Sequence, residues 1–251
     1  MFEALHHFAT SRRMCPLCEQ RVDDFLPLPA QFEENARRYG YVHFGRGETI
    51  NLTDYQCPCC GASDRERLYA LYLKQLPQFA GNGRLRLLHF APEGALSKLI
   101  LDLASVDYRT ADLSSAGVDD VVDITHMGCY PDAAFDAFIC SHVLEHVDDD
   151  KAALHELRRI LRPGGWGILM VPIMTHLDTT VEDPTATSEA DRWRLYGQGD
   201  HVRLYAKRDF LQRVGSVGFQ VRQLGVDHFG RRTFERYGIS ASSVLYVVSH
   251  D

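Results

Sequence analysis

Short apolar runs alternate with longer amphipathic segments from residue 85 to the end of the chain. The runs end at polar residues, and the segments at 94–103, 151–161 and 207–214 carry apolar residues at the spacing of a helix. Strands that alternate with helices predict a doubly wound α/β fold with a mostly parallel sheet. The seven predicted strands are 85–90, 106–111, 119–124, 135–140, 166–171, a strand that starts at 218, and 244–248.

Polar residues lie where several of the predicted strands end. Asp112 follows the second strand, Asp123 lies near the end of the third, and Ser141-His142 follow the fourth. In such a sheet, ligands bind outside the carboxyl ends of the strands, and an acid after the second strand hydrogen-bonds a ribose diol. The pattern predicts a nucleotide-type cofactor site at this edge. For Asp123 the alternative is an aspartate that caps a turn.

A linker helix is predicted between the first 62 residues and the α/β part. Ser63-Asp64-Arg65-Glu66 has the composition of an N-cap and a first helical turn. On this helix, Arg65 and Arg67 are expected on a solvated face, and the alternative is that they face the small N-terminal lobe or an anionic ligand. We therefore predict three parts, a small lobe at 1–62, the linker helix at 63–83 and an α/β domain at 84–251.

Cysteines are concentrated in the predicted lobe. Of seven in the chain, five lie before residue 61. Cys15-Pro16-Leu17-Cys18 and Cys57-Pro58-Cys59-Cys60 are two C-x-x-C knuckles, and two such knuckles can complete a tetrahedral Zn²⁺ site. The predicted ligands are Cys15, Cys18, Cys57 and Cys60, which would make the lobe similar to a zinc ribbon. The alternative is two unrelated turns with free thiols, and the pattern does not decide the role of Cys59.

Composition and charge narrow the classes of protein. The chain has 251 residues, a formal net charge of −7 and 45% hydrophobic residues. An acidic balance lowers the expectation of nucleic-acid binding without excluding it. No apolar run approaches the ~20 residues that span a bilayer, and Met1 to Met14 holds no apolar signal segment. We expect a cytoplasmic protein without a membrane partner.

Two stretches in the α/β part carry a family resemblance. Phe135 to Val147 reads F-D-A-F-I-C-S-H-V-L-E-H-V, and Leu154 to Gly165 reads L-H-E-L-R-R-I-L-R-P-G-G. Together with the order of elements they resemble a class I S-adenosylmethionine-dependent methyltransferase of the type-11 group. The resemblance implies a Rossmann-like methyltransferase fold that binds S-adenosylmethionine and releases S-adenosylhomocysteine.

The first loop departs from that family. The usual loop is D-x-G-x-G-x-G, whereas this chain has His89-Phe90-Ala91-Pro92-Glu93-Gly94-Ala95. One interpretation is a site that has lost methyl donation. The other is a subgroup with a different loop, in which Glu93 receives the ammonium group of the cofactor. The chain also resembles a bacterial subgroup with an H-F-A-P-E loop behind paired C-x-x-C knuckles.

The resemblance implies roles for individual residues at the strand ends. Asp112 would bind the ribose hydroxyls and Leu113 would flank the adenine, whose edge Asp123 and Ile124 would meet. Ser141 and His142 would lie beside the sulfonium. The implied cofactor-binding residues are Phe90, Ala91, Pro92, Glu93, Asp112, Leu113, Asp123, Ile124, Ser141 and His142. His146 is interpreted as a residue that starts a helix.

Residues 174–206 form an insertion that is longer than an ordinary α/β loop, and we expect a lid or substrate segment there. Its Asp200-His201-Val202-Arg203-Leu204-Tyr205 supplies a group that titrates near neutrality, a fixed cation and a phenol. His201 is predicted as a general base or substrate ligand and Arg203 as an anion clamp, with His142 as a third catalytic candidate. The alternative is a structural turn in which Arg203 pairs with a buried acid.

The combined hypothesis is a methyltransferase with a structural zinc lobe. It would act on an oxygen or nitrogen nucleophile of a small or medium-sized acceptor. Because the donor is already activated, the protein would mainly have to align nucleophile, methyl and sulfur. A non-catalytic ligand- or partner-binding protein on the same scaffold is one alternative. An RNA methyltransferase that docks through the zinc lobe is the other.

Overall fold

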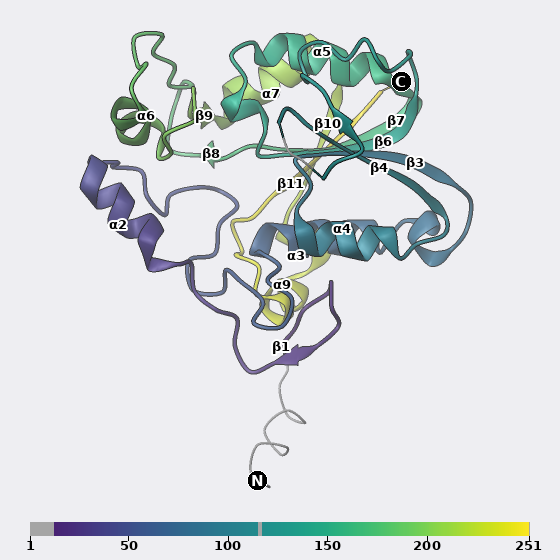
Figure 1. The fold of residues 1–251 in the computed structure, drawn as a ribbon. Helices are drawn as coiled ribbons and strands as arrows, with labels where there is room; N and C mark the ends of the chain where they lie inside the picture. The colour runs from purple at the N-terminus through teal and green to yellow at the C-terminus, as the bar shows by residue number, and fades with distance from the viewer. Residues whose placement is uncertain (1–12, 115–116, 251) are drawn as a thin grey trace, which may run out of the picture.

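The computed structural model describes residues 13–114 and 117–250, and its centre is a seven-stranded sheet (Figure 1). The strand order is β10-β11-β7-β6-β3-β4-β5. All neighbours are parallel except β11, which runs antiparallel to β7 and β10. The predicted α/β fold is confirmed. The strands are β3 (Leu85–Phe90), β4 (Val106–Asp112), β5 (Asp120–Val121), β6 (Phe135–Ser141), β7 (Leu161–Met170), β10 (Gln220–Leu224) and β11 (Leu245–Ser249).

Helices cover both faces of the sheet, with α3 and α4 on one face and α5 and α7 on the other (Figure 1). The central strands are therefore buried on both faces, which explains why β3 and β6 are almost continuous apolar runs. The N-cap predicted at Ser63 is confirmed, and it forms a capping box, because the Ser63 hydroxyl accepts from the Glu66 N–H while the Glu66 side chain accepts from the Ser63 N–H. The helices are α3 (Asp64–Leu73), η1 (Pro77–Ala80), α4 (Gly94–Leu101), η2 (Leu144–His146), α5 (Asp150–Ile160) and α7 (Lys207–Ser216).

Arg67 contradicts the expectation of a solvated face. Its side chain is fully buried, at 0% exposure. The guanidinium donates to the carbonyls of Tyr237 at 2.7 Å, Ala62 at 2.9 Å, Gly238 at 3.0 Å and Tyr55 at 3.1 Å, and to Asp54. A buried cation is tolerated only when its donors are satisfied. Arg67 therefore ties three parts of the chain together, and the prediction for it was wrong.

Two short helices lie between the last two strands. They are α8 (Val226–Phe229) and α9 (Arg231–Tyr237), and α9 packs against β1 (Arg13–Met14). Phe234 is buried, and Gly238 closes the helix at φ 62°.

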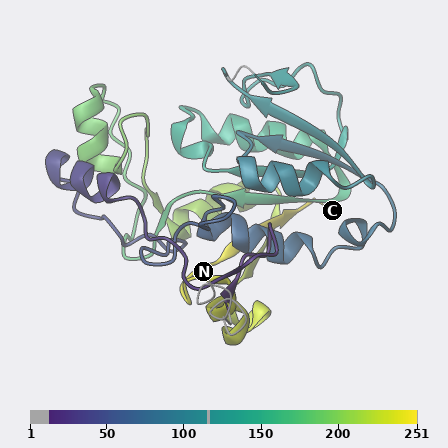
Figure 2. The same cartoon turned by 60° about the horizontal axis from the view of Figure 1, so that its bottom comes forward.

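The N-terminal segment packs in two places. Its hairpin of β1 and β2 (Arg21–Val22) joins the main core through Cys15, Val22 and Phe25. Its helix α2 (Ala30–Tyr39) lies beside α6 (Glu189–Tyr196) of the insertion (Figure 2).

The insertion begins directly after β7. It contains α6 between two short parallel strands, β8 (Ile173–Met174) and β9 (Tyr205–Ala206). Gly47 of the N-terminal segment forms a bridge to Met174, so the two segments meet beyond the end of β7. Among the residues that the structure describes, no helix is long and apolar enough to cross a membrane.

Candidate active site

A cleft of about 690 Å³ lies at the carboxyl ends of β3, β4 and β6, and we call it the strand-end cleft. Its walls come from the ends of these strands and the loops that follow, together with Asp200 of the insertion. Seven of the predicted cofactor residues line it: Phe90, Ala91, Asp112, Leu113, Asp123, Ile124 and His142. Ser141 is instead buried, with its hydroxyl 3.0 Å from the hydroxyl of Tyr69. Neither Pro92 nor Glu93 belongs to the lining.

The two acids of the cleft are held by their own turns. Asp112 accepts from the Ser114 N–H at 2.9 Å. Asp123 accepts from the Thr125 N–H at 2.8 Å and from its hydroxyl at 2.7 Å, and these bonds lower the pKa of Asp123. Asp123 thus caps a turn, as the alternative from the sequence had it, and also lines the cleft. Both carboxylates are fixed in place at the cleft wall.

The first loop rests on a buried network. His89 is fully buried, with Nε2 2.8 Å from Oε2 of Glu93 and Nδ1 2.8 Å from the hydroxyl of Tyr108. Arg65 Nε lies 3.7 Å from the other carboxylate oxygen of Glu93. Burial raises the pKa of Glu93, but the hydrogen bond and charge of His89 and the charge of Arg65 outweigh it and lower the pKa to about 2. Glu93 therefore remains ionised and faces His89 and Arg65.

Ala91 shapes the loop above this network. Its φ of 46° lies in the left-handed region, which favours glycine, and its N–H donates to the carbonyl of Ala111 at 2.9 Å. Its methyl group is the smallest side chain that a non-glycine residue can present to the cleft.

A second cleft, of about 160 Å³, lies between the N-terminal segment and the insertion, and we call it the lid cleft. Its lining from the N-terminal side includes Tyr41, His43 and Glu48, and its lining from the insertion includes Tyr196 and His201. His142 lines both clefts. Its φ of 56° turns the chain sharply after β6. Because His142 belongs to both linings, it lies between the two clefts.

Four titratable side chains gather at this junction. His142 Nδ1 lies 3.1 Å from Glu145 Oε1, and the rings of His146 and His201 are in edge contact at 4.6 Å between centroids. Burial lowers the pKa of His201 to about 4, so its imidazole is neutral at physiological pH. The sequence interpretation missed Glu145 and gave His146 only a structural role. The signal was present, since His142, Glu145 and His146 fall within one turn after β6.

Arg203 and Tyr205 hold the insertion against this turn. The Arg203 guanidinium donates to the carbonyls of Leu144 at 2.7 Å, Asp148 at 2.8 Å and Val147, and to Glu182. The Tyr205 hydroxyl donates to Asp150 at 2.7 Å. Arg203 is buried, and these contacts correspond to the structural alternative for this motif. The motif places His201 beside Glu145.

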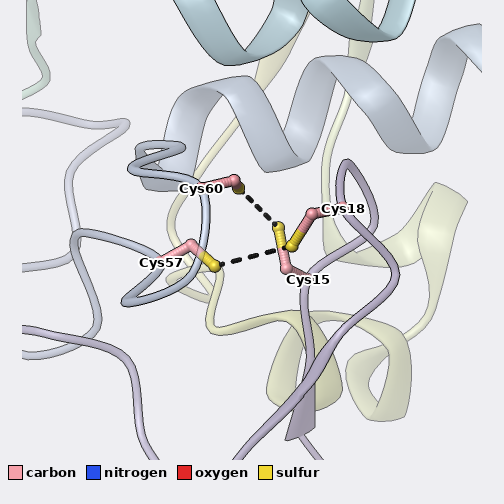
Figure 3. Close-up of side chains that lie close together, drawn as sticks. All are labelled: Cys15, Cys18, Cys57 and Cys60. Carbon is pink, nitrogen blue, oxygen red and sulfur yellow. Dashed lines mark hydrogen bonds between the residues drawn. The ribbon is translucent and has the colours of Figure 1, made fainter.

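The four predicted zinc ligands lie together (Figure 3). Cys15 Sγ is 3.6 Å from Cys60 Sγ, and Cys18 Sγ is 3.9 Å from Cys57 Sγ. A tetrahedral site with Zn–S bonds of about 2.3 Å requires sulfur atoms about 3.8 Å apart, so the spacing fits the ion. Cys59 is exposed and outside the group, although its N–H donates to Cys57 Sγ at 3.4 Å.

Comparison with known proteins links the strand-end cleft to a family. Residues 90–169 match the family model described as a methyltransferase domain. This stretch supplies the whole lining of the strand-end cleft except Asp200. No curated protein matches the chain.

The solved structures to which the chain is similar share little sequence with it. The SeMet-substituted CurJ carbon methyltransferase is 18% identical at a TM-score of 0.45, and the alignment covers 73% of this chain and 52% of that one. The [4+2]-cyclase SpnF is 16% identical at a TM-score of 0.46, and the alignment covers 90% of this chain and 97% of that one. A SAM-dependent methyltransferase from Archaeoglobus fulgidus is 16% identical at a TM-score of 0.45, and the alignment covers 65% of this chain and 73% of that one. The chain thus spans about half of the CurJ protein, and residues 90–169 are the part that matches a methyltransferase domain.

Proposed function

We propose that the protein is an S-adenosylmethionine-dependent methyltransferase with its cofactor in the strand-end cleft and its acceptor in the lid cleft. The observation that carries the proposal is that the two clefts meet at His142. Methyl transfer requires the acceptor atom, the methyl carbon and the sulfur in line. Two clefts that share one wall residue would bring a donor in one close to an acceptor in the other.

The residues of the strand-end cleft would share the binding of the cofactor. Asp112 stands at the end of the second strand of the sheet, where a carboxylate accepts from a ribose diol. The exposed side chain of Leu113 would cover one face of the adenine, and Asp123 with Ile124 would meet its edge. S-adenosylmethionine supplies an electrophilic methyl group on a sulfonium.

Glu93 has a different role in this proposal from the one expected on the sequence. Its carboxylate is shared between His89 and Arg65, and it does not line the cleft. We infer that it positions the first loop from behind. Ala91 would then offer the loop backbone to the methionine part of the cofactor.

The lid cleft suits a small acceptor with an oxygen or nitrogen nucleophile, given its volume of about 160 Å³ and its lining of aromatic and histidine side chains. His201 and His142 face it as the candidates for contact with the nucleophile. Arg203 would act through them, by holding the insertion in place.

We also propose that Cys15, Cys18, Cys57 and Cys60 bind a structural zinc ion. Four thiolates leave no coordination position for a substrate, so this ion would not take part in chemistry. It would join the two ends of the segment from 19 to 56, which supplies one wall of the lid cleft.

Calorimetry with S-adenosylmethionine tests the proposal. The protein should bind it, and Asp112→Ala should weaken binding about 10- to 100-fold, the value of a hydrogen bond to a charged group. Asp107→Ala is the matched control, because Asp107 is an exposed acid on the same strand. Absence of binding at millimolar S-adenosylmethionine would leave the non-catalytic alternative.

A further inference from the structure

Glu145, His146 and His201 form a compact cluster at the junction of the two clefts. One ligand atom from each lies within 4.8 Å of the others. His146 lines the strand-end cleft and His201 lines the lid cleft, so the cluster is open to both. It is separate from the four cysteines.

Two members of this cluster are buried without adequate partners. Glu145 is 0% exposed and His201 is 2% exposed. Within residues 13–114 and 117–250, neither carboxylate oxygen of Glu145 and neither ring nitrogen of His201 has a hydrogen-bond partner. His142 Nδ1 lies 3.1 Å from Glu145 Oε1 but in poor alignment for a hydrogen bond. Burying a carboxylate and an imidazole without hydrogen-bond partners costs several kcal/mol, and a cation held between them would offset this cost.

The surrounding chain holds the cluster in place. The Val202 N–H donates to the Glu145 carbonyl at 2.8 Å, which sets His201 against the turn after β6. Arg203 fixes the same turn through three backbone carbonyls. Asp200 lies 3.3 Å from Nδ1 of His146, and a carboxylate beside a ligand histidine commonly orients the ring in metal sites.

We propose that Glu145, His146 and His201 bind a divalent first-row transition-metal ion. Two imidazoles and one carboxylate are the donors that such ions accept, with coordination positions left open. Metal–ligand bonds of about 2.1 Å place neighbouring donors about 3 to 3.5 Å apart. Side-chain rotations that move the donor atoms by about an ångström would therefore bring them to bonding distance around an ion.

The site also indicates the class of acceptor, and this step rests on the proposed function. An ion between the two clefts would bind a hydroxyl oxygen of the acceptor and lower the pKa of that hydroxyl. The hydroxyl proton leaves to solvent, and an oxygen lone pair forms the new C–O bond to the methyl carbon. The C–S bond breaks with its electron pair going to sulfur, so the sulfonium becomes a neutral thioether. The acceptor class is then an oxygen nucleophile that can coordinate a metal.

Titration with Co²⁺ tests the site in the full-length protein with its cysteine-bound metal retained. We expect the protein to bind one added equivalent of Co²⁺. The bound ion should show weak d–d absorption without the intense charge-transfer bands of thiolate ligands. Glu145→Gln and His146→Gln should each weaken Co²⁺ binding at least tenfold. His146 is partly exposed, so its variant tests the site even where the Glu145 variant fails to fold. His155→Gln, an exposed histidine on α5, is the matched control and should bind Co²⁺ as the unmodified protein does.

Acetohydroxamate, a small chelating oxygen ligand, tests the acceptor class. It should shift the d–d absorption of the bound Co²⁺, because open positions face the clefts. Failure to bind Co²⁺ outside the cysteine group, or equal binding by all the variants, would overturn the metal site. If the d–d absorption of bound Co²⁺ does not change when acetohydroxamate is added, the proposed acceptor class is wrong. S-adenosylmethionine binding is measured separately on protein without added metal, so failure of the metal site is distinguishable from failure of the proposed function.

Discussion

The strand-end cleft and the lid cleft differ in how much of the chain they use. The strand-end cleft takes its lining from residues 90–149 and from Asp200 alone beyond them. The lid cleft is assembled from residues 28–65, from His142, and from residues 171–204. One site is therefore made by consecutive strand ends, and the other by contacts between segments more than 100 residues apart in sequence.

This difference predicts that the two clefts respond separately to substitution. The strand-end cleft depends on the sheet, whose core strands are buried on both faces. The lid cleft depends on a few tertiary ties, namely the cysteine group, the Arg67 contacts and the packing of α2 on α6. Breaking these ties should loosen the lid cleft while cofactor binding survives.

Cys57→Ser should have the largest effect. Because structural metal binding is also folding free energy, loss of one thiolate should lower the free energy of unfolding by more than about 5 kcal/mol and remove the bound metal. Hydrogen exchange of residues 41–50 should accelerate, while affinity for S-adenosylmethionine should change less than about threefold, or about 0.7 kcal/mol. Metal analysis, denaturation and exchange measure these outcomes.

Cys59→Ser is the matched control, since that thiol is exposed and outside the group. It should keep the metal and the stability. If Cys59→Ser and Cys57→Ser lose metal equally, the assignment of four ligands is incorrect.

Glu93→Gln should have the next largest effect, and here the strand-end cleft is the one disturbed. The substitution keeps the shape but leaves His89 and Arg65 without their carboxylate, and removal of one partner of a buried pair costs about 3–5 kcal/mol. Urea denaturation measures the change. Glu33→Gln is the control, because its pairing with Arg37 is a surface contact worth less than about 1 kcal/mol. Equal losses from both substitutions would show that the buried network has no special weight.

The Glu93 carboxylate should also make the stability of the folded protein depend on pH. The pKa of Glu93 is about 2 in the folded protein against 4.5 for an unperturbed glutamate, so the folded state prefers the ionised form. Its stabilisation is complete above about pH 4.5 and is lost as the pH falls towards 2. The stability difference between the unmodified protein and Glu93→Gln should shrink across this window, by on the order of 3 kcal/mol. A difference independent of pH from 5 to about 2.5 would contradict the ion pair.

Gly197→Ala should affect the lid cleft alone, by about 1–3 kcal/mol. Gly197 has φ 84°, and an added Cβ would lie 2.7 Å from the Tyr41 ring. Tyr41 also lines the lid cleft, so its displacement should change exchange rates around residue 41. Gly215→Ala is the control, because a Cβ there meets open space. A loss of cofactor affinity equal to the loss of stability would contradict the separation of the clefts.

What the sequence revealed follows the same division. The strands, the acids at their ends and the cysteine knuckles are local patterns, and Asp112, Asp123 and Cys15 lie where those patterns place them. Glu93 shows the limit, because its partners His89 and Arg65 come from two different elements that meet only in the folded protein.

The lid cleft was beyond local patterns for the same reason. Nothing in the spacing of Tyr41, Tyr196 and His201 indicates that they share a cavity. Arg67 was placed in solvent because an arginine in an amphipathic helix usually is, whereas its five carbonyl partners come from three segments. Long-range satisfaction of polar groups has no periodic signature.

Tyr39→Leu should produce the smallest effect and tests the tie between α2 and α6. The Tyr39 and Trp193 rings stack at 5.3 Å between centroids, and such a pair is worth about 0.5–1.5 kcal/mol beyond its apolar area. Leucine keeps an apolar side chain but loses the stacking, so the free energy of unfolding should fall by about 1 kcal/mol. Val42→Ala, at an exposed position nearby, should change stability by less than about 0.5 kcal/mol. Because α2 leads directly into the lid-cleft residues from Tyr41 onward, the Tyr39 variant should exchange faster there with unchanged cofactor affinity. Faster exchange at β3 and β6 as well would mean that the two clefts share one cooperative unit, and the distinction between them would fail.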